Sequence, residues 1–454
     1  MSLIIPFLLF SYPPVIIYGH LLLCYNLQTM IKKQILQNNV VLITQHEESS
    51  KVAAIGFYFS AGSRYENPGQ YGISHFTEHM LFKGTKTKSN KELSRIFDRM
   101  GGVTNAFTER ENVSVYCSVP VVKENNFKIA LETICDLSEN CTFPEEEFIK
   151  EKGVVENEII SVEDDPDDSS MDEIARLIWP DQNISRTITG SAEDVESITR
   201  QQMIAWYEKY FVHGELVVIA AGKINEEILT ETLSKLPQKK TSVEFYKNMH
   251  FPEKVSWQNG TFISKAKFNQ EQIFALFPLD WQLGYEDYLS LMIFDTITGD
   301  SMSSRLFLEL RERLGLCYSI GSFFTTYENA GLWAAYLVCE KKNAVRAAKA
   351  LDAEVNNLVA KEISQEEIDL AVERIMGLET MNDVNPVFLM RRLWNFYSLG
   401  FNLMTTEEFI QSIRLINKDD IISFVSRLID SSRKTMVVYG QKLSYSERKK
   451  IAGK

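Results

Sequence analysis

The sequence repeats one order of expected strands and helices with a period of about 200 residues. In the first copy a strand near residue 51 precedes a helix through HFTEHMLF, a helix over NKELSRIFDRM, and the strands VTNAFTE and NVSVYCSV. Ser89 is the expected N-cap of the second helix and Gly101 its stop. After residue 250 the strand QIFALFPL, helices near 285–298 and over SSRLFLELRERLG, and the strands LCYSIGSFFT and GLWAAYLVC follow in that order. Two related domains are therefore expected.

Each half then continues in the same way. Helices are expected over 121–139, 145–162 and near 194–209, and across 342–429 in the second half, before the closing strands ELVVIAAG and KTMVVYG. Because strands cluster apart from helices, the expected class is α+β, with mainly antiparallel sheets packed with helices. The polar segment KLPQKKTSVEFYKNMHFPEK would link domains at 30–240 and 250–454.

Residues 1–29 are strongly apolar, contain no Lys or Arg, and are interrupted by Pro6, Pro13 and Pro14. Proline disfavours a membrane-spanning helix, and the basic start and cleavage site of a secretory signal are absent. Met30 opens MIKKQILQNNVVLITQ, which is typical of a strand, an Asn-Asn turn and a second strand. We therefore expect 1–29 to lie outside the functional domain, with a signal or anchor as the alternative. Membrane association is expected only if this segment is retained.

Charge and cysteine content exclude some classes of protein. Lys and Arg number 48 against 61 Asp and Glu, so the net charge is −13 with His neutral. This balance argues against a nucleic-acid partner, which would need a basic surface. The six cysteines include no Cys-x-x-Cys pair, which argues against a zinc ribbon or a disulfide framework and favours a reducing compartment.

The segment His75-Phe76-Thr77-Glu78-His79 predicts a zinc site. On a helix His75 and His79 lie on one face, so both imidazoles can bind a single Zn²⁺ beside Glu78. A catalytic zinc takes three protein ligands and keeps a position for water, and His-x-x-Glu-His is the inverzincin signature. The alternative is a pair of surface histidines on an amphipathic helix.

The third ligand is expected on the helix IKEKGVVENEIISVEDDP. Glu151 and Glu158 are seven residues apart and share a face, with Val154 and Val155 expected between them on that face. A carboxylate among apolar neighbours is costly to bury unless it is paired or binds a metal. Glu158 is therefore the expected ligand of one zinc per chain, and Glu151 the group that orients the site; a solvated helix face is the alternative. The last 204 residues (454 − 250) contain no His, so only the first half can hold this site.

From Met30 to Gly440 the sequence resembles the pitrilysin, insulysin and mitochondrial processing peptidase family of inverted-motif zinc peptidases. The resemblance is carried by GSRYENPGQYGISHFTEHMLFKGT, GGVTNAFTERENVSVYCSVP, EKGVVENEI and SSRLFLELRERLGLCYSIGS. In its length and in the sequences of its motifs the chain is similar to the processing peptidase β-subunit and short bacterial relatives. The segment that corresponds to the Gly-rich loop of the α-subunit type reads ITGDSMSSRLF, so that loop is absent. It implies two domains that face each other across a chamber, and a zinc metalloendopeptidase that hydrolyses extended peptides or presequence-like segments.

The same resemblance implies roles for individual residues. His75, His79 and Glu158 match the family's zinc ligands. Glu78 matches its general base, and Glu151 matches the second glutamate of the site.

Five further residues match substrate-contacting positions of the family. Asn105, Ala106 and Phe107 match the edge-strand segment that pairs with an extended peptide. Arg311 and Tyr318 match an Arg and a Tyr that reach the substrate backbone from the second domain, where Tyr318 would assist the developing oxyanion. For these two, a helix-end cation and a half-buried strand aromatic are the alternatives.

The expected partners are a peptide substrate, favoured to be basic by the acidic charge, and a second chain in a homodimer or a processing-peptidase-like pair. A non-catalytic core-type subunit, or a catalytic subunit that needs a partner, is the rival. The acidic stretch from Glu163 to Glu173 is expected to be a solvated loop. The expected location is the bacterial cytoplasm; the mitochondrial matrix, or export through residues 1–29, is the alternative.

Overall fold

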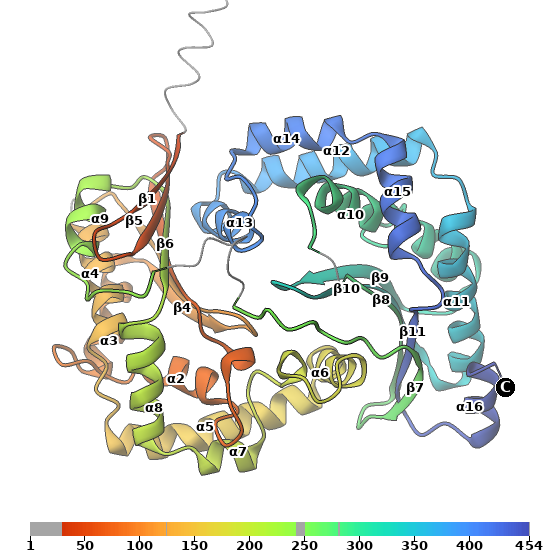
Figure 1. Cartoon of the computed structure of the whole chain (residues 1–454), viewed down its shortest axis with the longest axis horizontal. Coiled ribbons are helices and arrows are strands. Elements are labelled where there is room, and N and C mark those ends of the chain that lie inside the picture. Colours follow the sequence, from red (N-terminus) through yellow and green to blue (C-terminus); the bar gives the residue numbers. More distant parts are fainter. Residues whose placement is uncertain (1–29, 124, 242–249, 280–281, 454) are drawn as a thin grey trace, which may run out of the picture.

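The computed structural model describes residues 30–123, 125–241, 250–279 and 282–453, so the apolar segment 1–29 and linker residues 242–249 lie outside the described residues. The described chain forms two sheets, with strand orders β1-β2-β6-β3-β5-β4 and β7-β11-β8-β10-β9 (Figure 1). The strands are β1 (Ile31–Ile35), β2 (Val41–His46), β3 (Val52–Phe59), β4 (Val103–Thr108), β5 (Val113–Pro120), β6 (Leu216–Gly222), β7 (Gly260–Lys265), β8 (Gln270–Pro278), β9 (Ser319–Thr326), β10 (Gly331–Glu340) and β11 (Thr435–Gly440).

The two sheets have the same topology. The order β2-β6-β3-β5-β4 in the first sheet corresponds to β7-β11-β8-β10-β9 in the second. Each sheet has one parallel pair, β2 with β6 and β7 with β11, and its other pairs are antiparallel. The expected internal repeat and the mainly antiparallel α+β class are therefore confirmed. The first sheet adds β1, which joins β2 through a turn where Asn39 has φ 66°.

Helices connect and cover the strands in each half. The α-helices are α2 (Ile73–Leu81), α3 (Asn90–Met100), α4 (Asn126–Glu139), α5 (Glu145–Asp164), α6 (Pro166–Ile178), α7 (Ala192–Ser197), α8 (Arg200–Tyr207), α9 (Glu226–Leu233), α10 (Tyr285–Thr298), α11 (Ala344–Ala360), α12 (Gln365–Asn382), α13 (Pro386–Ser398), α14 (Thr406–Leu415), α15 (Lys418–Leu428) and α16 (Tyr445–Ile451). Short helical turns or π-helices occupy Ser63–Tyr65, Asn183–Ser185, Glu208–Val212, Phe307–Arg313 and Lys341–Asn343. Among the described residues, no helix has both the length and the apolar character needed to cross a membrane.

Two expectations about local structure are corrected. The acidic stretch from Glu163 to Glu173 is not a loop, because α5 runs to Asp164 and α6 begins at Pro166. The Asp165 side chain caps α6 by accepting hydrogen bonds from the next amides, and proline is well suited to the first turn of a helix. The helix expected near 194–209 is divided into α7 and α8, which have separate capping boxes.

The two halves exchange one helix each. Helix α13 of the second half packs on the first sheet, where Leu389, Met390 and Leu393 are buried against β2, β3 and β6. Helix α6 of the first half packs on the second sheet through Ile174 and Ile178. Figure 1 shows α13 beside the first sheet and α6 beside the second. Separating the halves would expose both apolar faces, so each half completes the burial of the other.

Glycine permits the close approach of α13. A Cβ atom on Gly56 of β3 would lie 2.6 Å from the sulfur of Met390. Beside this contact, Trp394 of α13 stacks on Tyr58 of β3 with the ring centroids 4.3 Å apart. The first sheet therefore has α13 on one face and the helices α2, α4 and α5 on the other.

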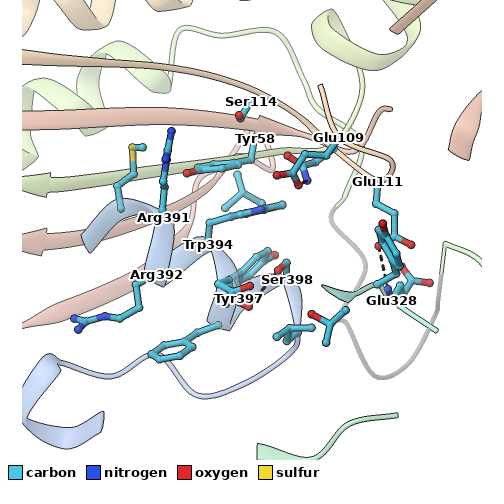
Figure 2. Close-up of a pocket in the computed structure, with 18 of the residues that line it drawn as sticks. Tyr58, Glu109, Glu111, Ser114, Glu328, Arg391, Arg392, Trp394, Tyr397 and Ser398 are labelled. Atoms are coloured by element: carbon cyan, nitrogen blue, oxygen red, sulfur yellow. Dashed lines mark hydrogen bonds between the residues drawn. The ribbon is translucent and has the colours of Figure 1, made fainter. Parts of the chain in front are cut away.

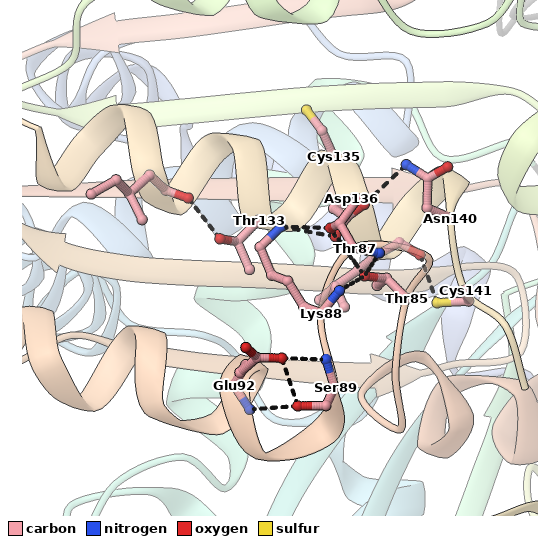
Figure 3. A network of polar contacts seen from close by, with 12 residues as sticks. Thr85, Thr87, Lys88, Ser89, Glu92, Thr133, Cys135, Asp136, Asn140 and Cys141 are labelled. Carbon is pink, nitrogen blue, oxygen red and sulfur yellow. Dashed lines mark hydrogen bonds and ion pairs between the residues drawn. The ribbon is translucent and has the colours of Figure 1, made fainter. Parts of the chain in front are cut away.

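A polar network fixes the loop between α2 and α3 onto α4 (Figure 3). The Asp136 carboxylate accepts hydrogen bonds from the hydroxyls of Thr85 and Thr87, both at 2.7 Å, and pairs with Lys88 at 2.9 Å. Directly after this loop, the Ser89 side chain and Glu92 form the capping box of α3, which confirms the expected N-cap. The loop that follows α2 is thus tied to the core of the first half.

The five cysteines of the described chain are free and four are buried, as expected for a chain without a disulfide framework.

A buried polar junction also joins the halves. The His250 ring lies between two buried carboxylates, 2.9 Å from Glu215 of the first half and 2.8 Å from Glu328 in the β9–β10 turn. The Glu328 amide donates to Glu111 at 3.0 Å, and Arg64 pairs with Glu111. Burial would lower the pKa of His250, but its hydrogen bonds with both carboxylates outweigh this effect and raise the pKa to about 9.

Replacement of His250 by Gln should destabilise the protein in a pH-dependent manner. Because the folded-state pKa is raised, His250 contributes its full stabilisation below its unfolded pKa of about 6.5, and the contribution disappears as the pH rises through about 9. The difference in Tm between wild type and H250Q should therefore shrink between pH 6 and pH 10, measured by thermal unfolding. The control is H213Q, because the His213 side chain is 62% exposed. An equal Tm difference at both pH values would contradict the imidazolium bridge.

Candidate active site

The helix α2 that carries the His-x-x-Glu-His motif is held at its N-terminus by a buried carboxylate. Glu66 is fully buried and accepts hydrogen bonds from the backbone amides of Gly72 at 2.8 Å and Ser74 at 2.9 Å. These amides would otherwise lack partners within the helix. Burial outweighs their hydrogen bonds and raises the pKa of Glu66 to about 8. Gly72 has φ 83°, and a Cβ there would lie 2.4 Å from the Thr189 carbonyl oxygen. The start of α2 is thus fixed by side-chain and backbone contacts.

Three side chains converge at the surface of α2 and α5. One ligand atom each from His75, His79 and Glu158 lies within 4.8 Å of the others. The Nε2 atoms of His75 and His79 are 3.4 and 3.0 Å from the two oxygens of Glu158. Ligands of a tetrahedral zinc with bonds of about 2.0–2.1 Å are roughly 3.3 Å apart, so this donor set fits the metal. The geometry therefore brings together the three ligands that the sequence predicts.

Glu151 lies behind this cluster, seven residues or about two helical turns before Glu158. It is 3% exposed, and its carboxylate accepts from Nδ1 of His79 at 3.1 Å and pairs with Lys83 at 2.6 Å. A carboxylate on the second ring nitrogen sets the tautomer of a metal-binding histidine and leaves Nε2 free for the metal. The His75 Nδ1 atom, in contrast, is buried and has no hydrogen-bond partner in the described chain.

The electrostatics of the cluster favour a cation between the carboxylates. Burial would lower the pKa of His79, but hydrogen bonds with Glu151 and Glu158 outweigh burial and raise the pKa to about 9. Hydrogen bonds from His75 and His79 hold the pKa of Glu158 well below its usual range. Burial raises the pKa of Glu151, but His79 and Lys83 outweigh it and lower the pKa. A proton on His79 thus balances the carboxylates, and a divalent cation would replace that proton on binding.

Glu78 projects beside the ligands and is held from the neighbouring strand. The Thr108 hydroxyl at the end of β4 donates to a Glu78 carboxylate oxygen at 2.7 Å. Because β4 is the last strand of its sheet, its outer edge is open to a further strand. Asn105, Ala106 and Phe107 lie on this edge strand, at the position that the sequence implies for peptide pairing.

One detail of α5 differs from the sequence expectation. Val155 is fully buried between Glu151 and Glu158, but Val154, on the other flank of the same face, is 43% exposed. Val154 lies three residues after Glu151 and four before Glu158, and Val155 has the reverse spacing, so helical geometry alone does not separate them. The packing of α5 buries Val155.

Arg311 and Tyr318 lie beside each other, and in the described chain neither has a recorded contact with the His-Glu cluster. The Arg311 guanidinium lies 5.5 Å from the Tyr318 ring centroid and 4.8 Å from that of Phe307. Tyr318 is 80% exposed. Within the described residues, the recorded contacts of these two side chains do not include His75, Glu78, His79 or Glu158.

Several residues of the site were not identified from the sequence. Lys83 and Thr108 orient Glu151 and Glu78, and Glu66 caps α2. Lys83 and Glu66 follow or precede the motif by a few residues, but nothing in their spacing distinguishes them from surface charges. Thr108 is separated from Glu78 by 30 residues, so their contact depends on the docking of β4 beside α2.

A cavity of about 630 Å³ lies on the other face of the first sheet, between the two halves. Its walls include Tyr58, Phe107 and Tyr116 from the first sheet, α13 residues such as Arg391, and Glu328 of the second half (Figure 2). Adjacent residues of a strand point to opposite faces, so Thr108 faces Glu78 while Phe107 faces the cavity. The end of β4 therefore borders both the ligand cluster and the cavity.

Comparisons with known proteins agree with this geometry. The sequence profile described as Insulinase (Peptidase family M16) matches residues 41–192, and the profile described as Peptidase M16 inactive domain matches residues 197–375. An uncharacterized zinc protease of Rickettsia bellii is 30% identical over 409 residues, which cover 90% of this chain and 97% of the relative. The mitochondrial-processing peptidase subunit beta of Bos taurus is 28% identical over 326 residues, covering 66% of this chain and 62% of the relative.

A solved protein structure shares the fold. The crystal structure of a protease from Helicobacter pylori superimposes with a TM-score of 0.80 at 19% identity, over 91% of this chain and 100% of that chain. Together with the sequence relatives, the repeated sheets and the His-Glu cluster, these matches establish that the chain belongs to the insulinase family of peptidases, M16.

Proposed function

We propose that this protein is a zinc metalloendopeptidase that cleaves extended peptides. The observation that carries the proposal is the convergence of His75, His79 and Glu158 beside Glu78. Three protein ligands with a neighbouring carboxylate form the arrangement of a catalytic zinc site, which keeps one position open. When bound, zinc would supply a Lewis acid that polarises the scissile carbonyl and lowers the pKa of water to about 7.

The side chains of this chain account for the proton transfers. Glu78 takes the proton of the attacking water and returns it to the leaving amine. The hydrogen bond from Thr108 restricts the Glu78 carboxylate to one orientation, with its other oxygen available for the water. Glu151 holds the His79 ring so that Nε2 faces the ligand cluster.

The open edge of β4 suits an extended substrate. A peptide that adds to Asn105, Ala106 and Phe107 as a strand gains main-chain hydrogen bonds with little demand on its sequence. The net charge of −13 favours basic peptides through long-range attraction.

A second copy of the chain would complete the site. Arg311 and Tyr318 lie together on the second half, with Tyr318 largely exposed and without a recorded contact to the ligand cluster. We therefore infer that they serve the cluster of a partner chain in a homodimer, where Tyr318 would assist the oxyanion. The alternative is a non-identical partner chain, since one relative is named as a subunit, the mitochondrial-processing peptidase subunit beta.

Replacement of Glu78 by Gln should lower kcat for a quenched fluorescent peptide by about 10²–10⁴-fold, because general-base catalysis supplies a factor of that size. Zinc content, measured by atomic absorption, should stay at one ion per chain because Glu78 is not a ligand. Glu156→Gln is the matched control on α5, and chelation should abolish wild-type cleavage. Undiminished cleavage by zinc-loaded E78Q would refute the proposed mechanism.

Replacement of Glu151 by Gln should weaken zinc binding by about 10–100-fold, because the His79 ring loses the carboxylate that orients it. The affinity is measured by competition with a chromophoric chelator, which requires no activity. Glu147→Gln, one turn earlier on α5, is the control. Equal affinities for wild type and E151Q would show that Glu151 does not support the metal.

Mixing two variants that are each impaired in a different part of the site, Glu78 or Tyr318, tests the shared site. In a homodimer with exchanged contributions, E78Q chains and Tyr318→Phe chains form mixed dimers with one intact site, and random pairing restores roughly a quarter of wild-type activity. Differently tagged chains that co-purify without any restored activity would show that Tyr318 acts within its own chain or has no catalytic role.

A further inference from the structure

Arg391 on α13 is a cation that reaches the cavity and has no acidic partner among the described residues. Its guanidinium carbon lies 4.8 Å from the ring centroid of Phe107 and 5.4 Å from that of Tyr116. Figure 2 shows the side chain pointing from α13 toward the first sheet. Arg391 is exposed, and the structure records no ion pair for it among the described residues.

The other cations that line the cavity are compensated. Arg110 pairs with Asp172 at 3.4 Å, Arg392 pairs with Glu379 at 3.2 Å, and His250 lies between Glu215 and Glu328. Among the described residues that line the cavity, Arg391 is therefore the cation without an acidic partner, and its charge is available to bind a ligand. Its planar N–H fork suits a carboxylate, and the two rings beneath it reduce the freedom that binding would otherwise remove.

The strand that is proposed to receive the peptide places substrate side chains beside Arg391. On β5, Ser114 pairs with Phe107 and Tyr116 pairs with Asn105, and both β5 residues line the cavity. Paired residues of neighbouring strands point to the same face, so Phe107 and Asn105 also project toward α13. A peptide residue opposite either of them would point to the same face, with Cβ atoms about 4.5–5.5 Å apart. That side chain would reach the guanidinium over the Phe107 ring.

The same position lies close to the bond that is cut. Thr108, the neighbour of Phe107, hydrogen-bonds the general base Glu78 at 2.7 Å. A group bound by Arg391 is thus within a few residues of the scissile bond, where a favourable contact can change kcat/KM.

We propose that Arg391 is a specificity-determining residue that binds a carboxylate of the substrate near the scissile bond. The inference rests on the proposed peptidase function. It predicts a local preference that opposes the general attraction of basic peptides: an acidic side chain, or a free C-terminus, is favoured at this one position. Charge-assisted bidentate hydrogen bonds of this kind favour carboxylate over neutral side chains by roughly tenfold or more.

The test is a set of peptides that place Glu, Gln or Lys at each position from two residues before to two residues after the cleaved bond. For wild type, kcat/KM should be about tenfold higher for Glu than for Gln at one of these positions. R391M, which keeps the length of the side chain, should remove this ratio, R391K should retain part of it, and R391E should favour Lys. A Glu/Gln ratio that is unchanged in R391M and R391E would overturn the proposal.

Matched peptides with free and amidated C-termini distinguish the two sources of the carboxylate. If the preference requires the free C-terminus and Arg391, the group that Arg391 binds is the terminal carboxylate. If it requires Glu and Arg391, the bound group is the Glu side chain. Lys33→Met is the control, because Lys33 also lies over an α13 ring, Tyr397 at 4.9 Å, but does not line the cavity. The ratio should stay at its wild-type value in K33M, and its loss there would attribute the preference to overall charge.

Peptide binding separates this proposal from the proposed catalysis. Fluorescence anisotropy of the same peptides is measured on E78Q and on E78Q/R391M, so no cleavage is required. Tighter binding of the Glu peptide to E78Q but not to E78Q/R391M would support Arg391 even if wild type cleaved none of the peptides. Equal binding of Glu and Gln peptides to E78Q would overturn it, even if wild type were an active peptidase.

Discussion

The reciprocal packing of α13 on the first sheet and of α6 on the second holds the two halves in one arrangement. Leu389, Met390 and Leu393 of α13 are buried against strands of the other half, and Ile174 and Ile178 of α6 are buried in the same way. Each such side chain contributes roughly 1.5–3 kcal/mol when it leaves water, so neither half is complete alone. The cavity, the His250 junction and the position of Arg391 all depend on this exchange.

The duplicated halves differ in the residues of the helix that follows the second shared strand, β3 in the first half and β8 in the second. In the first half α2 carries His75, Glu78 and His79, whose polar atoms face the partner helix α5 and the end of β4. In the second half α10 has ten buried residues, among them Leu291, Ile293 and Phe294, and lacks histidine. The helix of the second half thus has apolar side chains and no His where the first half has its His-Glu cluster, and residues 197–375 match the profile described as Peptidase M16 inactive domain.

Strand β4 connects the two parts of the proposed mechanism through the alternation of its side chains. Thr108 faces the helices and bonds Glu78, while Phe107 faces the cavity and stacks under Arg391. A peptide on the open edge would follow the same alternation, so successive side chains would meet the ligand cluster and the cavity in turn. The chemistry of cleavage and the recognition of the neighbouring residue would then be separated by the thickness of one sheet.

Much of the fold could be predicted because local sequence patterns indicate its helices and strands. Strand β5 alternates, the Ser89 capping box begins α3, and the spacing of His75 and His79 requires a helix to bring both rings to one face. Val154 was misplaced because two adjacent valines on α5 cannot be distinguished by spacing alone. The helix α6 was missed because its acidic sequence resembles a solvated loop, and its buried face packs on a sheet that begins about 90 residues later.

The sequence by itself determined the repeat, the class of fold and the identity of the three residues that converge, His75, His79 and Glu158. The repeat and the fold class follow from periodicity. The pairs His75/His79 and Glu151/Glu158 follow from spacings of one and two helical turns, and the family resemblance brings the two pairs together. Only the tertiary structure decided that Thr108 holds Glu78, that Lys83 shares Glu151 with His79, and that Arg391 lies over Phe107. The Thr108 and Arg391 contacts join elements that are distant in the chain, and the Lys83 contact depends on how α5 docks beside α2. All three are set by the packing of helices on sheets and on one another, which no local sequence pattern predicts.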